Sequence, residues 1–240
     1  MQFIGSLVFT VFLFIWTGFY AVLFSIGGSL TPYRHRFRWA PPWANVLLWM
    51  LKKTCGLGFV VDGRENLPAG NHVILVKHSS SWETFAQAVL FPPQTWVLKR
   101  ELTWLPFLGW SVRLLRAIAI NRSAGHSAVK GVVEQGKARL AEGCWIVIFP
   151  EGTRMPPGQT RKYGISGALL ATEAGRLIVP VAHDAGYYWP RRGLLKRRGT
   201  IHVHIGPAIS TAGRDPRDIN AEAQAWIEAH SQPVASGATA

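Results

Sequence analysis

His78 and Glu83 are a histidine and a carboxylate placed closely enough in sequence to act as a pair. On a continuous helix a spacing of five residues would put the two side chains about 140° apart, so they meet only if the chain turns between them. The three serines that follow His78 favour such a turn and can cap a helix. A carboxylate that faces an imidazole fixes its tautomer and stabilises its cation. The pattern therefore predicts a His–carboxylate general-base pair.

The flanking elements place this pair at the end of a strand. Residues 72–77 (HVILVK) form an apolar run typical of a buried strand, and residues 82–90 have the pattern of a helix. Ligands bind preferentially where a strand of an open α/β sheet gives way to a helix. The alternative is structural only: His78 ends the strand and Glu83 caps the helix.

A second polar cluster follows another apolar strand, residues 144–149. Gly152 permits a close approach of the backbone to a ligand, and Thr153 adds a hydroxyl. Arg154 offers a planar fork that suits phosphate, and we expect Glu151 to organise the loop or contact a polyol. The cluster predicts an anion site, although a simple surface turn has a similar composition.

The remaining pattern predicts an α/β fold with a mostly parallel or mixed sheet flanked by helices, because short apolar runs alternate with longer amphipathic ones. We expect strands at residues 57–62, 72–77, 95–98, 117–121, 144–149, 177–182 and 201–205, and helices at 82–90, 108–115, 124–141, 165–174 and 216–229. Asp215 followed by Pro216 is typical of a helix start.

The N-terminus has the character of a membrane anchor. Residues 1–33 contain no Asp, Glu, Lys or Arg. Residues 3–26 would span about 36 Å as a helix, enough for a bilayer core of about 30 Å. A basic and aromatic stretch follows at 34–39, and residues 43–51 are apolar but too short to cross, which predicts an interfacial helix. A crossing helix and a hairpin in one leaflet both fit this pattern.

We therefore divide the chain into a membrane-anchoring helical region (1–56), an α/β domain (57–230) and a disordered tail (231–240). The positive-inside tendency places the α/β domain on the cytoplasmic face, as at a bacterial inner membrane.

Charge indicates a polyanionic partner, since 26 Lys and Arg stand against 13 Asp and Glu, a formal net charge of +13. The basic run 191–198 is compatible with nucleic acid, but an apolar anchor on the same chain favours an anionic membrane surface, so we expect no nucleic-acid partner. His202 and His204 share one strand face without an obvious third ligand, so we expect no metal site.

Four blocks in order resemble the glycerolipid acyltransferases, and among them the 1-acylglycerol-3-phosphate acyltransferases. The blocks are His78 to Glu83, Lys99 to Arg122, Phe149 to Arg154, and Ile178 to Val181. Two departures exist: Glu83 stands where the family usually has Asp, and Asn121 precedes Arg122 where an acid is more usual. The extra methylene of Glu83 still allows it to reach an imidazole.

The resemblance implies acyl transfer from acyl-CoA or acyl carrier protein to the 2-hydroxyl of lysophosphatidate, which gives phosphatidic acid in phospholipid synthesis. It implies His78 and Glu83 as catalytic residues and no cofactor besides the thioester co-substrate. The substrate-binding residues would be Lys99, Arg122, Glu151, Gly152, Thr153 and Arg154. Two alternatives stay open: an acyltransferase for another lyso-lipid, and a basic membrane-tethered scaffold without activity.

Overall fold

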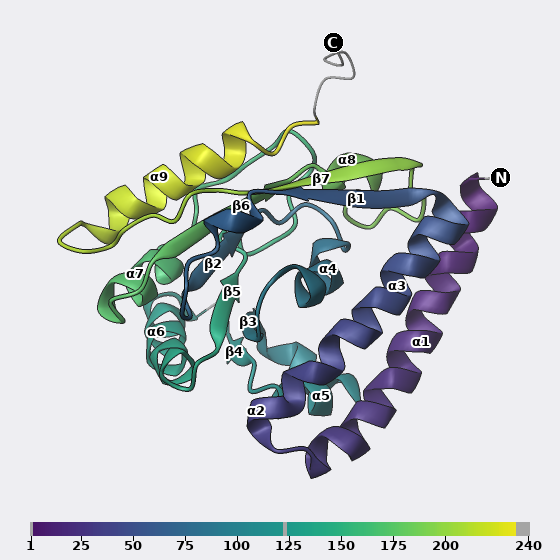
Figure 1. The fold of residues 1–240 in the computed structure, drawn as a ribbon, viewed down its shortest axis with the longest axis horizontal. Coiled ribbons are helices and arrows are strands. Elements are labelled where there is room, and N and C mark those ends of the chain that lie inside the picture. The colour runs from purple at the N-terminus through teal and green to yellow at the C-terminus, as the bar shows by residue number, and fades with distance from the viewer. Residues whose placement is uncertain (1, 122–123, 234–240) are drawn as a thin grey trace.

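A computed structural model describes residues 2–121 and 124–233, which form one seven-stranded sheet with helices on both faces (Figure 1). The strand order is β1-β7-β6-β2-β5-β3-β4, and β6 and β7 are the antiparallel neighbours. The strands are β1 (Leu57–Asp62), β2 (Val73–Val76), β3 (Gln94–Lys99), β4 (Ile118–Ile120), β5 (Trp145–Ile148), β6 (Ile178–His183) and β7 (Gly199–Ile205). All seven predicted strands exist, and the predicted mixed α/β architecture is confirmed.

Side chains of β2 alternate between two apolar cores, as successive residues of a strand must. Ile74 and Val76 belong to one core, and Val73 and Leu75 to the other. Because β2 is buried on both faces, its sequence is a continuous apolar run rather than an alternating one. This central position sets the direction of the polar residues that follow the strand.

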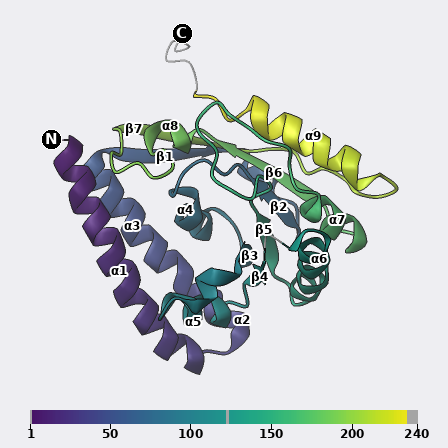
Figure 2. The same ribbon diagram turned by 180° about the vertical axis from the view of Figure 1, so that it is seen from behind.

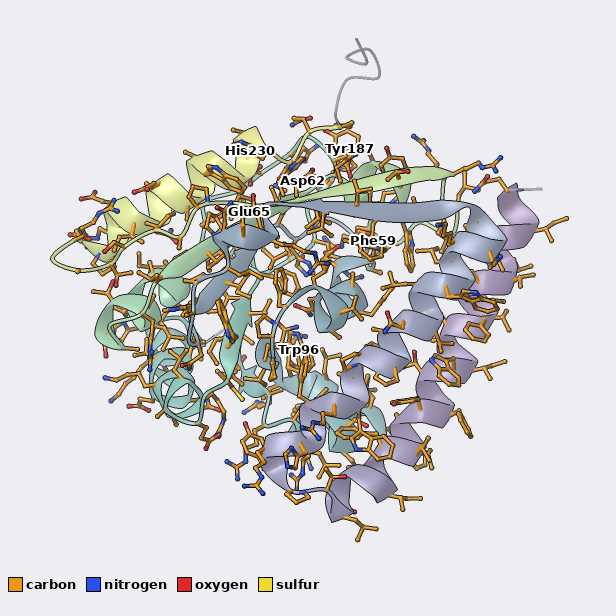
Figure 3. The ribbon with its side chains drawn as sticks, viewed as in Figure 1. Phe59, Asp62, Glu65, Trp96, Tyr187 and His230 are labelled. Carbon is orange, nitrogen blue, oxygen red and sulfur yellow. The ribbon has the colours of Figure 1, made fainter. Side chains whose placement is uncertain are left out.

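Helices cover each face of the sheet (Figures 1 and 2). One face carries α6 (His126–Ala141), α7 (Ser166–Glu173) and α9 (Pro216–Ala229), and the other carries α3 (Ala40–Cys55) and α4 (Glu83–Leu90). Figure 3 shows the labelled side chains of Phe59 and Trp96 in the space between the sheet and α3, where both pack against the core. The predicted start of α9 is confirmed, since the Asp215 carboxylate accepts from the Arg217 backbone N–H at 2.7 Å.

The N-terminal helix α1 (Gln2–Leu30) lies against the protein along its whole length (Figure 1). The Gln2 side chain donates to the Cys55 carbonyl at 2.9 Å, Trp16 to the Trp43 carbonyl at 3.2 Å, and Tyr20 to the Trp39 carbonyl at 2.8 Å. At 29 residues it is the helix among the described residues that is long and apolar enough to cross a membrane.

The outward face of α1 is strongly apolar and exposed. Its exposed positions recur every three or four residues, as one face of a helix requires: Phe3, Ile4, Leu7, Val8, Val11, Phe14, Ile15, Phe19, Leu23, Ile26 and Leu30. Helix α3 is longer than the interfacial helix predicted at residues 43–51, because its two prolines lie in the first turn instead of before it.

Two four-residue helices were not predicted from sequence: α2 (Tyr33–Arg36) and α8 (Ala185–Tyr188). Helix α5 (Leu108–Leu114) was predicted and is one residue shorter than expected. Four residues are too few for a periodic pattern. In the predicted disordered tail, Ser231 is buried and donates to the Ile227 carbonyl at 2.6 Å, while residues 234–240 lie outside the described part.

Candidate active site

The predicted pair meets at the carboxyl end of β2. Nδ1 of His78 lies 2.8 Å from Oε1 of Glu83, the first residue of α4. The turn between them is held by Ser80, whose backbone N–H lies 3.0 Å from both Glu83 carboxylate oxygens and whose hydroxyl accepts from the Trp82 N–H at 3.1 Å. The serines therefore supply the turn that the spacing demands.

Burial and hydrogen bonding set the charge of this pair. Burial alone raises the pKa of Glu83, but the hydrogen bond from His78 outweighs it and holds that pKa below its ordinary value. An ionised Glu83 accepts from the protonated Nδ1 of His78, which leaves Nε2 of the ring as the basic nitrogen. The ring also stacks on Phe149 at a centroid distance of 4.3 Å, so its plane is fixed.

His183, at the end of β6, is a site residue that the sequence analysis missed. Its Nδ1 accepts from the Ala185 N–H at 3.3 Å, so Nε2 carries the proton and donates to the Lys77 carbonyl at 2.9 Å. The same Nε2 lies 3.8 Å from Oε2 of Glu83. Burial lowers the pKa of His183, which keeps the ring neutral. This histidine thus fixes the backbone directly before His78 and lies beside the catalytic carboxylate.

Lys77 joins three parts of the chain through its buried ammonium group. Nζ lies 3.2 Å from Glu151 Oε1 and 2.7 Å from Glu228 Oε2 on α9. Tyr163 also donates to Glu228 at 2.7 Å. Removing one partner of a buried ion pair leaves an uncompensated charge, at a cost of about 3–5 kcal/mol. The network therefore fixes the ends of β2 and β5 relative to α9.

Glu151 belongs to this network. Its carboxylate accepts from the His78 backbone N–H at 3.2 Å, and burial raises its pKa to about 7 although the Lys77 ammonium opposes that shift. With its side chain engaged by these groups, Glu151 has the geometry of a loop organiser, the first of the two roles expected for it.

The loop from Glu151 to Arg154 lies beside His78, since the Met155 N–H donates to the His78 carbonyl at 2.7 Å. Gly152 has a φ of 67°, a backbone conformation that favours glycine, and a Cβ added there would meet no heavy atom of the described residues within 4 Å. The Arg154 guanidinium makes no hydrogen bond or ion pair with the described residues. Thr153 lies between the two and is partly exposed. The loop thus places a guanidinium group next to a tight glycine turn, an arrangement that suits an anion.

One of the expected substrate-binding residues, Lys99, lies apart from this cluster. Lys99 ends β3, which is separated from β2 by β5, and its exposed Nζ lies 3.3 Å from Glu101. No contact between Lys99 and His78 or Glu83 exists among the described residues. Arg122 lies outside the described part of the chain.

His202 and His204 pair with different carboxylates. His202 Nδ1 lies 3.3 Å from Asp184, and His204 Nδ1 lies 3.5 Å from Asp62 on β1. Across residues 2–121 and 124–233, no cluster of three His, Cys, Asp or Glu side chains could hold a metal ion.

This fold, with a His–carboxylate pair at the end of a central strand and a Gly–Thr–Arg loop beside it, matches a known family. The acyltransferase family model matches residues 58–184, and the chain belongs to that family. It is 44% identical over 202 residues to a 1-acyl-sn-glycerol-3-phosphate acyltransferase of Pseudomonas aeruginosa, covering 82% of this chain and 79% of that enzyme. The resemblance inferred from the four blocks is confirmed.

More distant relatives agree. A Saccharomyces cerevisiae enzyme of the same name is 31% identical over 203 residues, covering 81% of this chain and 65% of that one. The crystal structure of the 1-acyl-sn-glycerophosphate (LPA) acyltransferase PlsC from Thermotoga maritima superposes with a TM-score of 0.79 at 19% identity over 95% of both chains. At that identity the likeness establishes the fold.

Proposed function

We propose that the chain transfers a fatty acyl group from an acyl thioester to the 2-hydroxyl of 1-acylglycerol 3-phosphate and so forms phosphatidic acid. The observation that carries this proposal is the 2.8 Å contact between His78 Nδ1 and Glu83, in a chain 44% identical to an enzyme of that name. Because Glu83 holds Nδ1, the basic Nε2 would be the nitrogen that takes the proton of a reacting hydroxyl.

The reaction needs one proton to move twice. His78 Nε2 takes the proton of the 2-hydroxyl as its oxygen attacks the thioester carbonyl carbon. The tetrahedral intermediate then expels the thiolate, which takes the proton from the imidazolium. Glu83 stabilises that imidazolium, and positioned general-base help contributes about 10² to 10⁴ in rate. A thiolate is a good leaving group, so one histidine is sufficient.

The acceptor's phosphate would bind to Arg154, with the backbone at Gly152 close to the ligand and Thr153 adding a hydroxyl. Lys99, which ends β3, and Arg122 would add positive charge for the same phosphate. The thioester donor is acyl-CoA or acyl carrier protein, and no cofactor takes part.

The anchoring mode follows from the packing of α1. Contacts at its start, middle and later turns hold it to the protein, and Ser6 accepts from the Lys196 backbone N–H at 2.9 Å. A helix that crossed a bilayer would have to leave this surface over much of its length of about 43 Å. We therefore propose that α1 lies along one leaflet with its exposed face in lipid, and that the α/β domain lies on the cytoplasmic side of the inner membrane.

Transfer in a defined system tests the function. The full chain in detergent is supplied with acyl-CoA, and thiol release is followed with and without lysophosphatidate, while the lipid product is identified by mass. We expect release that requires the acceptor, and a folded His78→Ala variant without it. Release with another lyso-lipid alone would select that acceptor, and no release with any acceptor would favour the scaffold alternative.

A further inference from the structure

A hollow of about 380 Å³ lies among α1, α2 and α5, and we call it the arginine hollow. Its lining consists of Ser25, Arg36, Trp110, Arg113, Leu114 and Arg116. Arg116 lies two residues before the start of β4, whereas His78 lies two residues after the end of β2, and β2, β5, β3 and β4 are mutually parallel. The arginine hollow therefore lies at the opposite edge of the sheet from His78. It is not part of the candidate active site.

Three guanidinium groups converge on this hollow, and its lining contains no acid. Arg36 donates to the Thr31 and Leu114 carbonyls at 3.0 and 3.2 Å. Arg116 lies over the Tyr33 ring at 4.0 Å and donates to Glu142 at 2.7 Å.

Glu142 is a weak counter-charge for this cluster, because it is shared with Arg139, also at 2.7 Å. Arg113 is exposed, and its guanidinium makes no hydrogen bond or ion pair with the described residues. The hollow thus holds unbalanced positive charge in the geometry that suits phosphate oxygens.

Backbone strain precedes α5, which carries Trp110 and Arg113. Phe107 before the helix has a φ of 60°. Non-glycine residues rarely adopt this region and keep it only where the surrounding structure imposes it, which occurs preferentially at ligand sites. Arg116 after the helix has a φ of 51° as the left-handed residue of a helix C-cap, because its N–H donates to the Arg113 carbonyl at 2.9 Å and the Ala117 N–H donates to the Val112 carbonyl at 3.0 Å.

The surface next to the hollow is apolar. Trp104, Leu105, Phe107 and Trp110 are each between 41% and 61% exposed. This surface lies next to α1, because the Ser111 hydroxyl donates to the Ala21 carbonyl at 3.2 Å and the Ser25 hydroxyl donates to the Phe107 carbonyl at 3.5 Å. A cationic hollow bordered by exposed tryptophans and next to an apolar helix matches a lipid headgroup above its acyl chains. A nucleic acid or a phosphopeptide would leave the apolar border in water.

We propose that the arginine hollow binds the phosphodiester headgroup of an anionic membrane phospholipid, whose acyl chains lie against the apolar surface formed by α1 and residues 104–110. Such a lipid would be a bound neighbour of the enzyme and not its acceptor, because the site is remote from His78. The proposal does not depend on the transfer reaction.

Binding of a short-chain phosphatidylglycerol to the full chain in neutral detergent tests it, with stoichiometry from native mass spectrometry and affinity from titration. We expect one lipid per chain, and at least tenfold weaker binding for Arg113→Gln. Arg217→Gln is the matched control, since Arg217 is an exposed arginine on α9 at a distance from the hollow (Figure 1). It should bind within twofold of the wild type.

Further measurements test whether a lipid or another phosphate compound occupies the arginine hollow, and whether charge alone accounts for binding. Arg113→Lys keeps the positive charge but lacks the planar guanidinium group, so we expect an intermediate affinity. A thermal melt verifies that each variant is folded. Neither lysophosphatidate nor inorganic phosphate at the lipid's concentration should displace the lipid, and Arg113→Gln should keep its transfer rate in neutral micelles. Equal weakening by Arg113→Gln and Arg217→Gln, or displacement by either competitor, would overturn the proposal.

Discussion

Replacing Glu83 by Gln keeps the shape of the side chain and removes its charge. In the wild type the carboxylate accepts from two donors, the His78 Nδ1–H at 2.8 Å and the Ser80 N–H at 3.0 Å. An amide has one acceptor and one donor group, so its NH₂ must face a donor in either orientation. The substitution therefore weakens the hold on the His78 tautomer and no longer stabilises the imidazolium.

The expected loss follows from related catalysis. Replacing the carboxylate of a Ser-His-Asp triad by an amide lowers kcat about 10⁴-fold, and general-base help altogether is worth about 10² to 10⁴. We expect kcat to fall by about 10² to 10⁴ for Glu83→Gln, which corresponds to about 3–5 kcal/mol in activation free energy. KM for lysophosphatidate should change little, because Glu83 is 2% exposed and is enclosed by protein donors.

The assay is the initial rate of thiol release at saturating acyl-CoA, with lysophosphatidate varied so that kcat and KM separate. Glu134→Gln, which changes an exposed acid on α6, is the matched control and should retain the wild-type rate. A folded Glu83→Gln enzyme with kcat within threefold of the wild type would refute the reasoning, because it would show that the charge of Glu83 contributes nothing to the transition state.

The remaining predictions concern the groups around this pair. Arg154→Ala should lower kcat/KM for lysophosphatidate tenfold to a hundredfold, since charged hydrogen bonds contribute about 1.5–3 kcal/mol, and an equal loss with a neutral monoacylglycerol would contradict phosphate binding. His183→Ala should lower kcat about tenfold at unchanged KM, whereas His183→Asn, which can still donate to the Lys77 carbonyl, should recover part of it; equal rates for both variants would count against this positioning role. Because burial raises the pKa of Glu151 from 4.5 to about 7, the folded chain retains a proton that the unfolded chain releases over that range. The free energy of unfolding should therefore fall as the pH rises through 7, and urea midpoints from about pH 5 to 8 should decline less for Glu151→Gln; an unchanged slope would argue against the raised pKa.

Sequence alone predicted the strands because their signal is local. The apolar runs that became β2 and β5 are short, continuous and bounded by polar or turn-forming residues, as strands buried on both faces must be. The His78–Glu83 pair was predictable for the same reason, because its turn and its helix start lie within six residues. The four sequence blocks, which occur in the same order as in the glycerolipid acyltransferases, then indicated the family.

Contacts between distant segments were not predictable, because local sequence patterns do not determine the order of the strands in the sheet. His183 reaches Lys77 only because β6 lies next to β2, and Glu228 reaches Lys77 only because α9 packs over β6. Lys99 shows the converse: it lies in a matching block, yet its side chain pairs with Glu101 at the surface. A sequence motif therefore indicates that a residue belongs near the site, whereas the strand order determines which side chains it contacts.

The glutamate at position 83, where the family usually has an aspartate, is explained by how α4 is anchored. Trp82 is 1% exposed and packs against the rings of Phe59 and His183, and Phe85 is buried one turn into the helix, so the core fixes where α4 begins. From that start the Glu83 carboxylate spans the gap to His78 and still receives the Ser80 N–H. A side chain one methylene shorter would require α4 to move toward β2 against this packed core. The longer acid is thus the residue that this particular helix position needs to hold the imidazole.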